Sequence, residues 1–260
     1  MQYIKVAIIQ ADLVWLNATQ NRLQFLHKIN QLKENVDLII LPEMFTTGFS
    51  MQPQEIAESM KGSTVKWMQK IAAEKNAAIS GSVIIAEDGK YYNRFLFVHP
   101  SGELNFYNKK HLFTLAGAHR IYTSGKEKLI VSYKGWKLCP LVCYDLRFPV
   151  WARNVENYDA LIYVANWPKP RITAWDTLLK ARAIENMCYT IGVNRVGKDA
   201  NNLAYSGHSA AYDCLGKKLI DTPPNQEATE IITLDKNHIA TIRNKLNFLE
   251  DKDLFDIKNQ

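Results

Sequence analysis

LCPLVCYDLRFP, residues 138–149, is the stretch of sequence that decides the fold. Five apolar residues lead into Cys143, and a polar turn carrying a tyrosine, an aspartate and an arginine follows at once. A short apolar run that ends in a turn is typical of a buried strand. Because backbone pairing fixes the position of a strand end, α/β proteins present reactive side chains there. The stretch therefore predicts an α/β protein with a buried strand at 136–143 and a reactive thiol at its end.

Two further segments place a charged side chain at the end of an apolar run. IILPEMFTTGF, residues 39–49, carries Glu43, and FYNKKHLF, residues 106–113, carries the adjacent pair Lys109 and Lys110. Since side chains alternate along a strand, only one lysine of the pair faces inward. The residues alone leave open which of the two it is.

A thiol, a carboxylate and an ammonium together suit hydrolysis of an amide through a covalent intermediate. A thiolate is a strong nucleophile, but a free cysteine with a pKa of about 8.5 is mostly protonated at neutral pH. A nearby ammonium favours the thiolate, and a carboxylate can accept the thiol proton and return it to the leaving amine. The ammonium and the backbone N–H of Tyr144 can then hold the oxyanion.

The rest of the chain alternates strands and helices and contains hairpin signals. This pattern favours helices packed outside two stacked sheets over an open parallel sheet, in one domain spanning residues 1–260. Asn17 is the expected cap of the first helix, whose inner face is expected to carry Leu23, Leu26, Ile29 and Leu32. We expect helices from residue 19 onward and at 63–75, 148–155 and 174–187, and strands at 4–10, 36–43, 77–85, 93–99, 104–109, 129–133, 136–143, 160–166, 189–194 and 230–234.

Composition and spacing exclude several classes of function. The net charge is +6, but the basic residues are spread along the chain and form no nucleic-acid-binding motif, so we expect no nucleic-acid partner. No apolar stretch approaches the roughly 18 residues of a membrane span. The four cysteines lie scattered in apolar sequence, which favours reduced thiols and a cytoplasmic location. No metal-ligand spacing or phosphate-binding glycine motif occurs, so neither metal nor cofactor is expected.

The segments LPEMF, KKHLF and VCYDLRFP resemble the three signature segments of the nitrilase superfamily, the carbon–nitrogen hydrolases. YVANWP at 163–168 and KARAIEN at 180–186 extend the resemblance over essentially the whole chain. It implies a four-layer αββα sandwich, a homodimer or higher homo-oligomer, and a Glu–Lys–Cys set of Glu43, Lys110 and Cys143. The combination of motifs looks most like the omega-amidase branch, which hydrolyses short 2-oxo-dicarboxylic acid monoamides such as 2-oxoglutaramate.

Substrate-binding residues are expected in and beside the same motifs. Phe49, Phe113 and Trp167 are candidates for the pocket wall, and Arg171, Arg147 and Asn166 are candidates for binding a substrate carboxylate. We expect Asp145 and Arg147 to form an ion pair that braces the turn after Cys143.

One position departs from the family pattern. Many members carry a second glutamate shortly after the lysine segment, and alignment with that pattern places it at Ala118. The missing carboxylate points to slower turnover but not to a different fold or reaction class. The neighbouring His119 could compensate for the absent glutamate. Two rival functions remain open: a nitrilase or N-carbamoyl amidohydrolase with the same triad, and a catalytically weak binding or scaffold protein.

Overall fold

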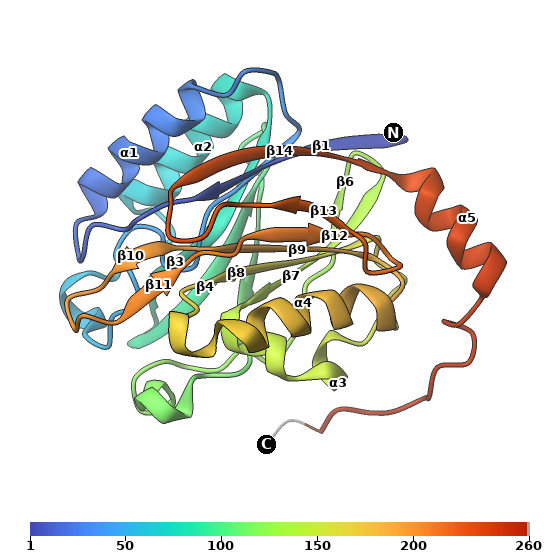
Figure 1. The fold of residues 1–260 in the computed structure, drawn as a ribbon. Coiled ribbons are helices and arrows are strands. Elements are labelled where there is room, and N and C mark those ends of the chain that lie inside the picture. Colours follow the sequence, from blue (N-terminus) through green and yellow to red (C-terminus); the bar gives the residue numbers. More distant parts are fainter. Residues whose placement is uncertain (259–260) are drawn as a thin grey trace.

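Two six-stranded sheets lie face to face in the computed structural model, which describes residues 1–258 (Figure 1). The first sheet has the order β14–β1–β2–β3–β4–β5 and the second the order β13–β12–β9–β8–β7–β6. In the first sheet the strands are β1 (Tyr3–Gln10), β2 (Leu38–Ile40), β3 (Ala78–Glu87), β4 (Lys90–Val98), β5 (Leu104–Asn108) and β14 (Ala228–Asp235). In the second they are β6 (Val131–Tyr133), β7 (Trp136–Val142), β8 (Ala160–Ala165), β9 (Tyr189–Asn194), β12 (Ala210–Tyr212) and β13 (Lys218–Asp221).

Helices cover the outer face of each sheet, which gives the expected αββα layers. Figure 1 shows α1 (Ala18–Asn30) and α2 (Ser63–Lys75) on one side, and α3 (Pro149–Ala152) and α4 (Ile172–Glu185) on the other. A short ribbon of β10 (Val196–Lys198) and β11 (Ala204–Ser206) and a final helix, α5 (Lys236–Leu246), complete the chain. The sequence did not predict the ribbon or α5.

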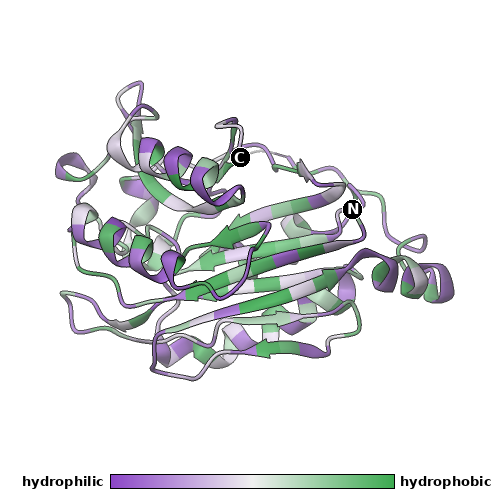
Figure 2. Cartoon of the chain, turned by 90° about the horizontal axis from the view of Figure 1, so that it is seen from above, coloured by the Kyte–Doolittle hydropathy of each residue, from purple (hydrophilic) through white to green (hydrophobic). Residues whose placement is uncertain are grey.

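Alternation along β1 shows why its sequence is apolar on both faces. Ile4, Val6 and Ile8 pack between the two sheets, whereas Ala7 and Ile9 pack under α1 and α2. A strand covered on both sides has no solvent face, so apolar residues run without a break. Figure 2 shows the same division, with largely green strands between helices that mix purple and green.

The first helix begins where the sequence predicts, but its buried face is different. The Asn17 side chain accepts a hydrogen bond from the backbone N–H of Gln20 at 3.0 Å, as a cap does. The buried stripe runs through Asn21, Phe25 and Ile29, and Leu23 is 61% exposed. The inclusion of Leu23 in the inner face was therefore wrong, because the i, i+4 row that contains Phe25 contacts the sheet.

The parallel strands at the centre of each sheet bring the predicted motifs together. β1, β2 and β3 run parallel in one sheet, and β7, β8 and β9 run parallel in the other. Glu43 follows β2, Cys143 follows β7 and Asn166 follows β8. Side chains at the carboxyl ends of parallel strands lie at one edge of their sheet. Stacking of the two sheets therefore brings Glu43, Cys143 and Asn166 close together.

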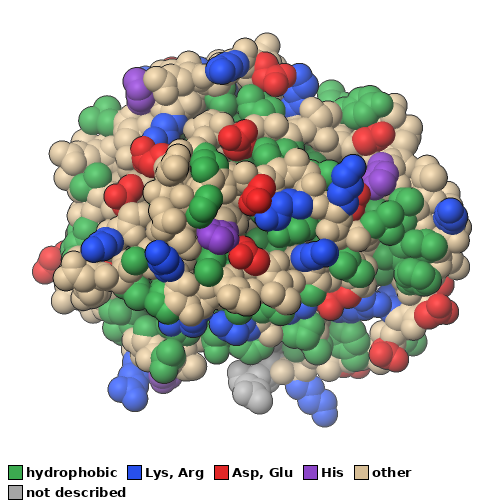
Figure 3. Space-filling view, in the orientation of Figure 1, with side chains coloured by type: hydrophobic (Ala, Val, Ile, Leu, Met, Phe, Trp, Pro, Cys, Tyr) green, Lys and Arg blue, Asp and Glu red, His purple; other side chains and the backbone are tan. Residues whose placement is uncertain are grey.

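The surface carries charges of both signs. Figure 3 shows Lys and Arg side chains interspersed with Asp and Glu over the face in view. Of the helices within residues 1–258, none combines the length and apolar character that crossing a membrane requires.

Candidate active site

Cys143 occupies a strained position at the start of a tight turn. It follows β7 directly and has φ +48°, a left-handed conformation that costs free energy for a residue with a side chain. The 3₁₀ turn Cys143–Arg147 begins there. The turn lifts the thiol off the sheet and into a cavity of about 180 Å³. Backbone strain of this kind persists only where the surrounding structure holds the residue in place.

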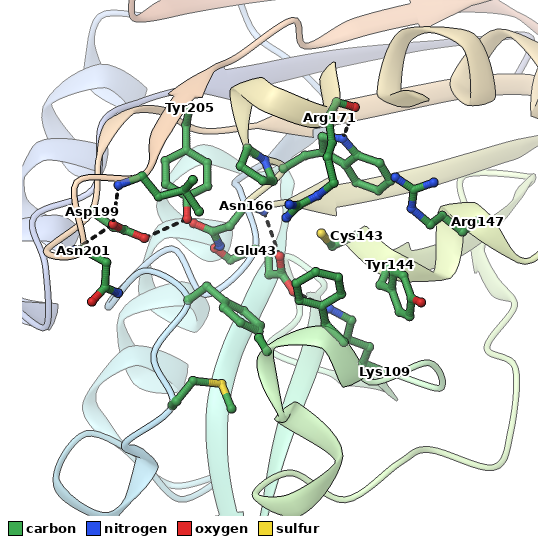
Figure 4. A pocket seen from close by; sticks show the side chains of 17 residues that line it. Glu43, Lys109, Cys143, Tyr144, Arg147, Asn166, Arg171, Asp199, Asn201 and Tyr205 are labelled. Carbon is green, nitrogen blue, oxygen red and sulfur yellow. Dashed lines mark hydrogen bonds and ion pairs between the residues drawn. The ribbon is translucent and has the colours of Figure 1, made fainter. Parts of the chain in front are cut away.

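Glu43 is fully buried and receives hydrogen bonds on both carboxylate oxygens. Asn93 Nδ2 and Lys109 Nζ each donate to Oε1 at 2.7 Å, and the backbone N–H of Asn166 donates to Oε2 at 2.8 Å. The same carboxylate lies close enough to the Cys143 thiol to raise its pKa. Figure 4 shows the carboxylate beside the cysteine, and both residues line the cavity. A buried carboxylate with this many donors is held in one orientation.

Lys109, and not Lys110, is the cation of this site, so the prediction of Lys110 was wrong. Lys109 is 2% exposed and pairs with Glu43, whereas Lys110 Nζ lies 5.3 Å from the centre of the Trp151 ring. The reason is strand alternation: Tyr107 and Lys109 share the inward face at the end of β5. The backbone N–H of Lys109 donates to the carbonyl of Asn93, which fixes the register.

The charges of the site set the resting protonation of the thiol. Burial, and next the Glu43 carboxylate, raise the pKa of Cys143 well above its usual range, and the nearby Lys109 ammonium offsets only part of this. Burial alone would lower the pKa of Lys109, but Glu43 and Cys143 outweigh it and the pKa is raised. The resting site therefore holds a neutral thiol next to a charged lysine.

Asp145 braces the turn that carries Cys143, but not through Arg147. It is fully buried and accepts four hydrogen bonds: from the backbone N–H and Nδ1 of His111, from Tyr107 Oη, and from the Val142 backbone N–H, all at 2.8–3.0 Å. Arg147 points elsewhere, with its guanidinium 4.9 Å from the centre of the Trp167 ring. The expected ion pair was wrong, because these donors already occupy the carboxylate.

The cavity is lined by every residue that the sequence placed in the substrate pocket. Arg171 lies 5.2 Å over the Phe113 ring, and its carbonyl accepts a hydrogen bond from the Trp167 indole at 2.8 Å. The expected wall residues Phe49, Phe113 and Trp167 line it, as do the expected carboxylate-binding residues Arg147, Asn166 and Arg171, and Tyr144 lies there too. The lining residues that the sequence did not predict are Met51, Lys109, Ala116, Pro168, Asp199, Asn201, Leu203 and Tyr205.

Four of the missed residues belong to the loop around the β10–β11 ribbon. Asp199 organises this loop by accepting hydrogen bonds from the backbone N–H groups of Asn201 and Leu203 at 2.8 and 3.0 Å. Its other oxygen accepts from Tyr205 Oη at 3.0 Å. Figure 4 places this group on the opposite side of the cavity from Arg147. The only sequence signal was an ordinary polar loop, which does not reveal what it covers.

Ala118 is packed in an apolar cluster and leaves no carboxylate near the lysine from that position. It is 2% exposed and packs with Met44, Ile84 and Tyr122. His119 is exposed, so it does not take the place of the expected glutamate. Nor does any group of three or more His, Cys, Asp or Glu side chains within residues 1–258 have an arrangement that could hold a metal ion.

Comparison with solved structures supports the fold. XC1258 from Xanthomonas campestris, described as a CN-hydrolase superfamily protein with an arsenic adduct in the active site, superposes with a TM-score of 0.96. It is 41% identical, and the match covers 99% of this chain and all of that chain. Nit3 of Saccharomyces cerevisiae, a member of branch 10 of the nitrilase superfamily, has the same fold with a TM-score of 0.84 and 23% identity over 94% of each chain.

Comparison with curated proteins points to the same family. The omega-amidase YafV of Yersinia enterocolitica is 42% identical over 98% of this chain and 99% of its own length. The 2-oxoglutaramate amidase of Bacillus subtilis is 30% identical over 96% of this chain and 98% of its own. The sequence profile of the carbon-nitrogen hydrolases matches residues 5–244. The chain therefore belongs to the carbon-nitrogen hydrolase family, whose members are hydrolases acting on non-peptide carbon–nitrogen bonds.

Proposed function

We propose that this protein is an omega-amidase that hydrolyses the terminal carboxamide of a short 2-oxo-dicarboxylic acid monoamide, with 2-oxoglutaramate as the reference substrate. The observation that carries the proposal is the contact between Glu43, Lys109 and the Cys143 thiol at one end of a small cavity that also contains two arginines. The names of the relatives YafV and 2-oxoglutaramate amidase support the substrate class.

Acylation begins with the neutral thiol. Cys143 Sγ attacks the carboxamide carbon while its proton passes to Glu43, so that thiolate character develops only as the carbon–sulfur bond forms. The carbonyl oxygen gains a negative charge, which Lys109 Nζ and the backbone N–H of Tyr144 stabilise. Glu43 then returns the proton to the nitrogen, the carbon–nitrogen bond breaks, and ammonia leaves a thioester on Cys143.

Deacylation uses the same groups with water in place of the thiol. Glu43 takes a proton from water, whose oxygen attacks the thioester carbon. The carbon–sulfur bond breaks, the proton returns to Cys143 Sγ, and the free acid departs. The proposed reaction calls on no metal or organic cofactor in either half.

Arg147 and Arg171 supply the charge that an acidic substrate requires. Both line the cavity with Cys143, and each guanidinium lies over an aromatic ring, Trp167 or Phe113 respectively. A guanidinium can bind a carboxylate through two parallel hydrogen bonds. We assign these arginines to the carboxylate of the 2-oxo acid, with Phe49 and Trp167 packing on the carbon chain.

The direct test is ammonia release from 2-oxoglutaramate by the purified protein. We expect activity in the wild type and none above background in Cys143→Ala. Cys139→Ala is the matched control, because that thiol is fully buried in β7 and does not line the cavity. Intact mass spectrometry after rapid mixing should show a thioester adduct on Cys143. An adduct on Cys139, Cys188 or Cys214 would contradict the assignment.

The same experiment separates the rival functions. A nitrilase would convert the corresponding nitrile faster than the amide, and a carbamoylase would prefer an N-carbamoyl amino acid. A scaffold protein would release no ammonia from any short-chain amide. We further propose that one catalytic domain spans the chain, that it acts in the cytoplasm, and that it forms a homodimer or higher homo-oligomer, which analytical ultracentrifugation can test.

A further inference from the structure

Asn166 is held beside the Glu43 carboxylate by two hydrogen bonds. Its backbone N–H donates to Glu43 Oε2 at 2.8 Å, and its side-chain Nδ2 donates to the Glu43 backbone carbonyl at 2.6 Å (Figure 4 marks the first). A backbone carbonyl can only accept, so the amide nitrogen of Asn166 must face it. This fixes the orientation of the side chain and directs its oxygen, Oδ1, away from that carbonyl.

The oxygen that remains has no partner in the part of the chain that the structure describes. Asn166 is 6% exposed, yet Oδ1 is buried without a hydrogen bond within residues 1–258. A buried acceptor of this kind normally has a partner, because leaving it unpaired costs free energy. Asn166 also lines the cavity together with Glu43 and Cys143. Asn166 therefore brings an unsatisfied acceptor to the wall of the cavity.

The chemistry of the oxygen restricts which ligand atom it can meet. A substrate carboxylate is itself an acceptor and would be repelled, so the cation-rich side of the cavity suits that group better than Asn166. A nitrile nitrogen and an ester oxygen carry no hydrogen. A primary carboxamide carries two N–H bonds, and both stay on the nitrogen when Glu43 adds the proton that makes ammonia the leaving group.

We propose that Asn166 Oδ1 accepts an N–H from the substrate carboxamide and from the departing ammonia, and so makes the site selective for primary amides over esters and nitriles of the same acid. The proposal rests on the amidase function proposed above. Glu43 delivers the proton to the leaving nitrogen, and Asn166 touches Glu43 through two bonds. The two residues thus contact the same nitrogen, one as proton donor and the other as acceptor.

Asn93 provides a matched comparison. It also donates from Nδ2 to Glu43, at 2.7 Å, and its Oδ1 is likewise buried without a partner within residues 1–258. However, Asn93 is not among the residues that line the cavity. Asn93 therefore contacts the same carboxylate without reaching the leaving group, so its replacement reports the cost of disturbing Glu43 alone.

The test compares kcat/KM for 2-oxoglutaramate with kcat/KM for the methyl ester of the same acid, which forms the same thioester. We expect Asn166→Ala to lower the amide-to-ester ratio by about tenfold, the loss of one good hydrogen bond. Asn166→Ser should lower the ratio similarly and provides a second, polar replacement. Asn93→Ser should slow both substrates by the same factor and leave the ratio unchanged.

Each outcome decides the proposal. An unchanged ratio in a folded Asn166→Ala or Asn166→Ser protein would overturn it, as would an equal fall of the ratio in Asn93→Ser. Either result would leave the amidase function intact, because the wild type would still release ammonia. A wild type that hydrolyses the ester but no amide would refute the proposed function and this inference together.

Discussion

The two fully buried carboxylates near the nucleophile differ in the partners that surround them. Glu43 pairs with the Lys109 ammonium, lies near the Cys143 thiol and lines the cavity. Asp145 has four fixed donors and does not line the cavity. Both lie within a few residues of a strand end, so burial and location do not separate them.

Under the proposed mechanism, the difference separates a carboxylate that exchanges protons from one that holds structure. Glu43 has a thiol and an open cavity on one side, so a proton can arrive and leave again. Asp145 accepts hydrogen bonds from backbone N–H groups, a tyrosine and a histidine, and these bonds hold its side chain in place. We therefore expect replacement of Glu43 to abolish the chemistry, and replacement of Asp145 to loosen the turn that carries Cys143.

Replacing Glu43 with glutamine should have the largest effect. The amide of Glu43→Gln would keep the shape of the side chain but could not carry the proton, so we expect kcat/KM for ammonia release to fall about 10³-fold. The Lys109 ammonium would also be left buried without its partner, which should lower the free energy of unfolding by about 3 kcal/mol. Steady-state kinetics and chemical denaturation measure the two effects separately.

A double variant separates the two roles of Glu43. Glu43→Gln combined with Lys109→Met removes both members of the buried pair, which should recover much of the lost stability. It should recover none of the activity. Return of activity in the double variant would show that Glu43 serves only to neutralise the lysine, and the contrast with Asp145 would disappear.

Replacing Lys109 should have the next largest effect and tests the corrected assignment. Lys109→Met should lower kcat by about 10²-fold through loss of an oxyanion donor. Because the ammonium lowers the pKa of Cys143, its loss should raise that pKa further, reduce the thiolate fraction and slow alkylation by iodoacetamide at about pH 8. Lys110→Met is the control, since Lys110 lies over Trp151, and it should change kcat by no more than about threefold. A larger loss in Lys110→Met than in Lys109→Met would restore the original prediction.

The sequence predicted the layers and the motifs well because both follow from local patterns. Apolar runs ending in Glu43 and Cys143 indicated strand ends, and stacked sheets follow from the alternation of strands, hairpins and helices. The choice between Lys109 and Lys110 failed for a physical reason. It depends on the phase of alternation at the last residues of β5, and that phase is set by pairing with Asn93 on β4.

Contacts between distant segments account for the other failures. Asp145 was expected to pair with Arg147 two residues away, but His111 and Tyr107 from the lysine segment occupy it instead. Asn93, which contacts Glu43, lies in a strand without any motif. Tyr205 reaches the cavity from β11, a short strand that the sequence did not predict. Pairings of this kind are properties of the folded chain, and no sequence spacing encodes them.

Replacing Asp145 should have a moderate effect that differs in kind from that of Glu43. Asp145→Asn would leave some of the four donors unpaired and should lower the free energy of unfolding by about 2 kcal/mol. A displaced nucleophile should lower kcat by about tenfold, with KM little changed. Asp159→Asn is the matched control: that buried carboxylate accepts from the Lys137 backbone N–H at 2.8 Å and precedes β8 at the opposite end of the strand from Asn166. Asp159→Asn should lower the free energy of unfolding but leave kcat unchanged. If kcat fell as much in Asp159→Asn as in Asp145→Asn, general destabilisation would explain the loss of kcat in both variants.

Restoring a carboxylate at Ala118 should have the smallest effect on turnover. Ala118 packs against Met44, Ile84 and Tyr122, so a glutamate there would enter an apolar cluster and lose hydration. Lys109 already has a direct ionic partner at 2.7 Å in Glu43. We therefore expect Ala118→Glu to lower the melting temperature. It should change kcat by less than about tenfold, because Lys109 already has an ionic partner and needs no second carboxylate. Ala118→Gln, equal in size and uncharged, is the control. A rise in kcat well above tenfold in Ala118→Glu alone would show that the missing carboxylate limits the reaction, and that the buried site operates best with two proton-exchanging carboxylates instead of one.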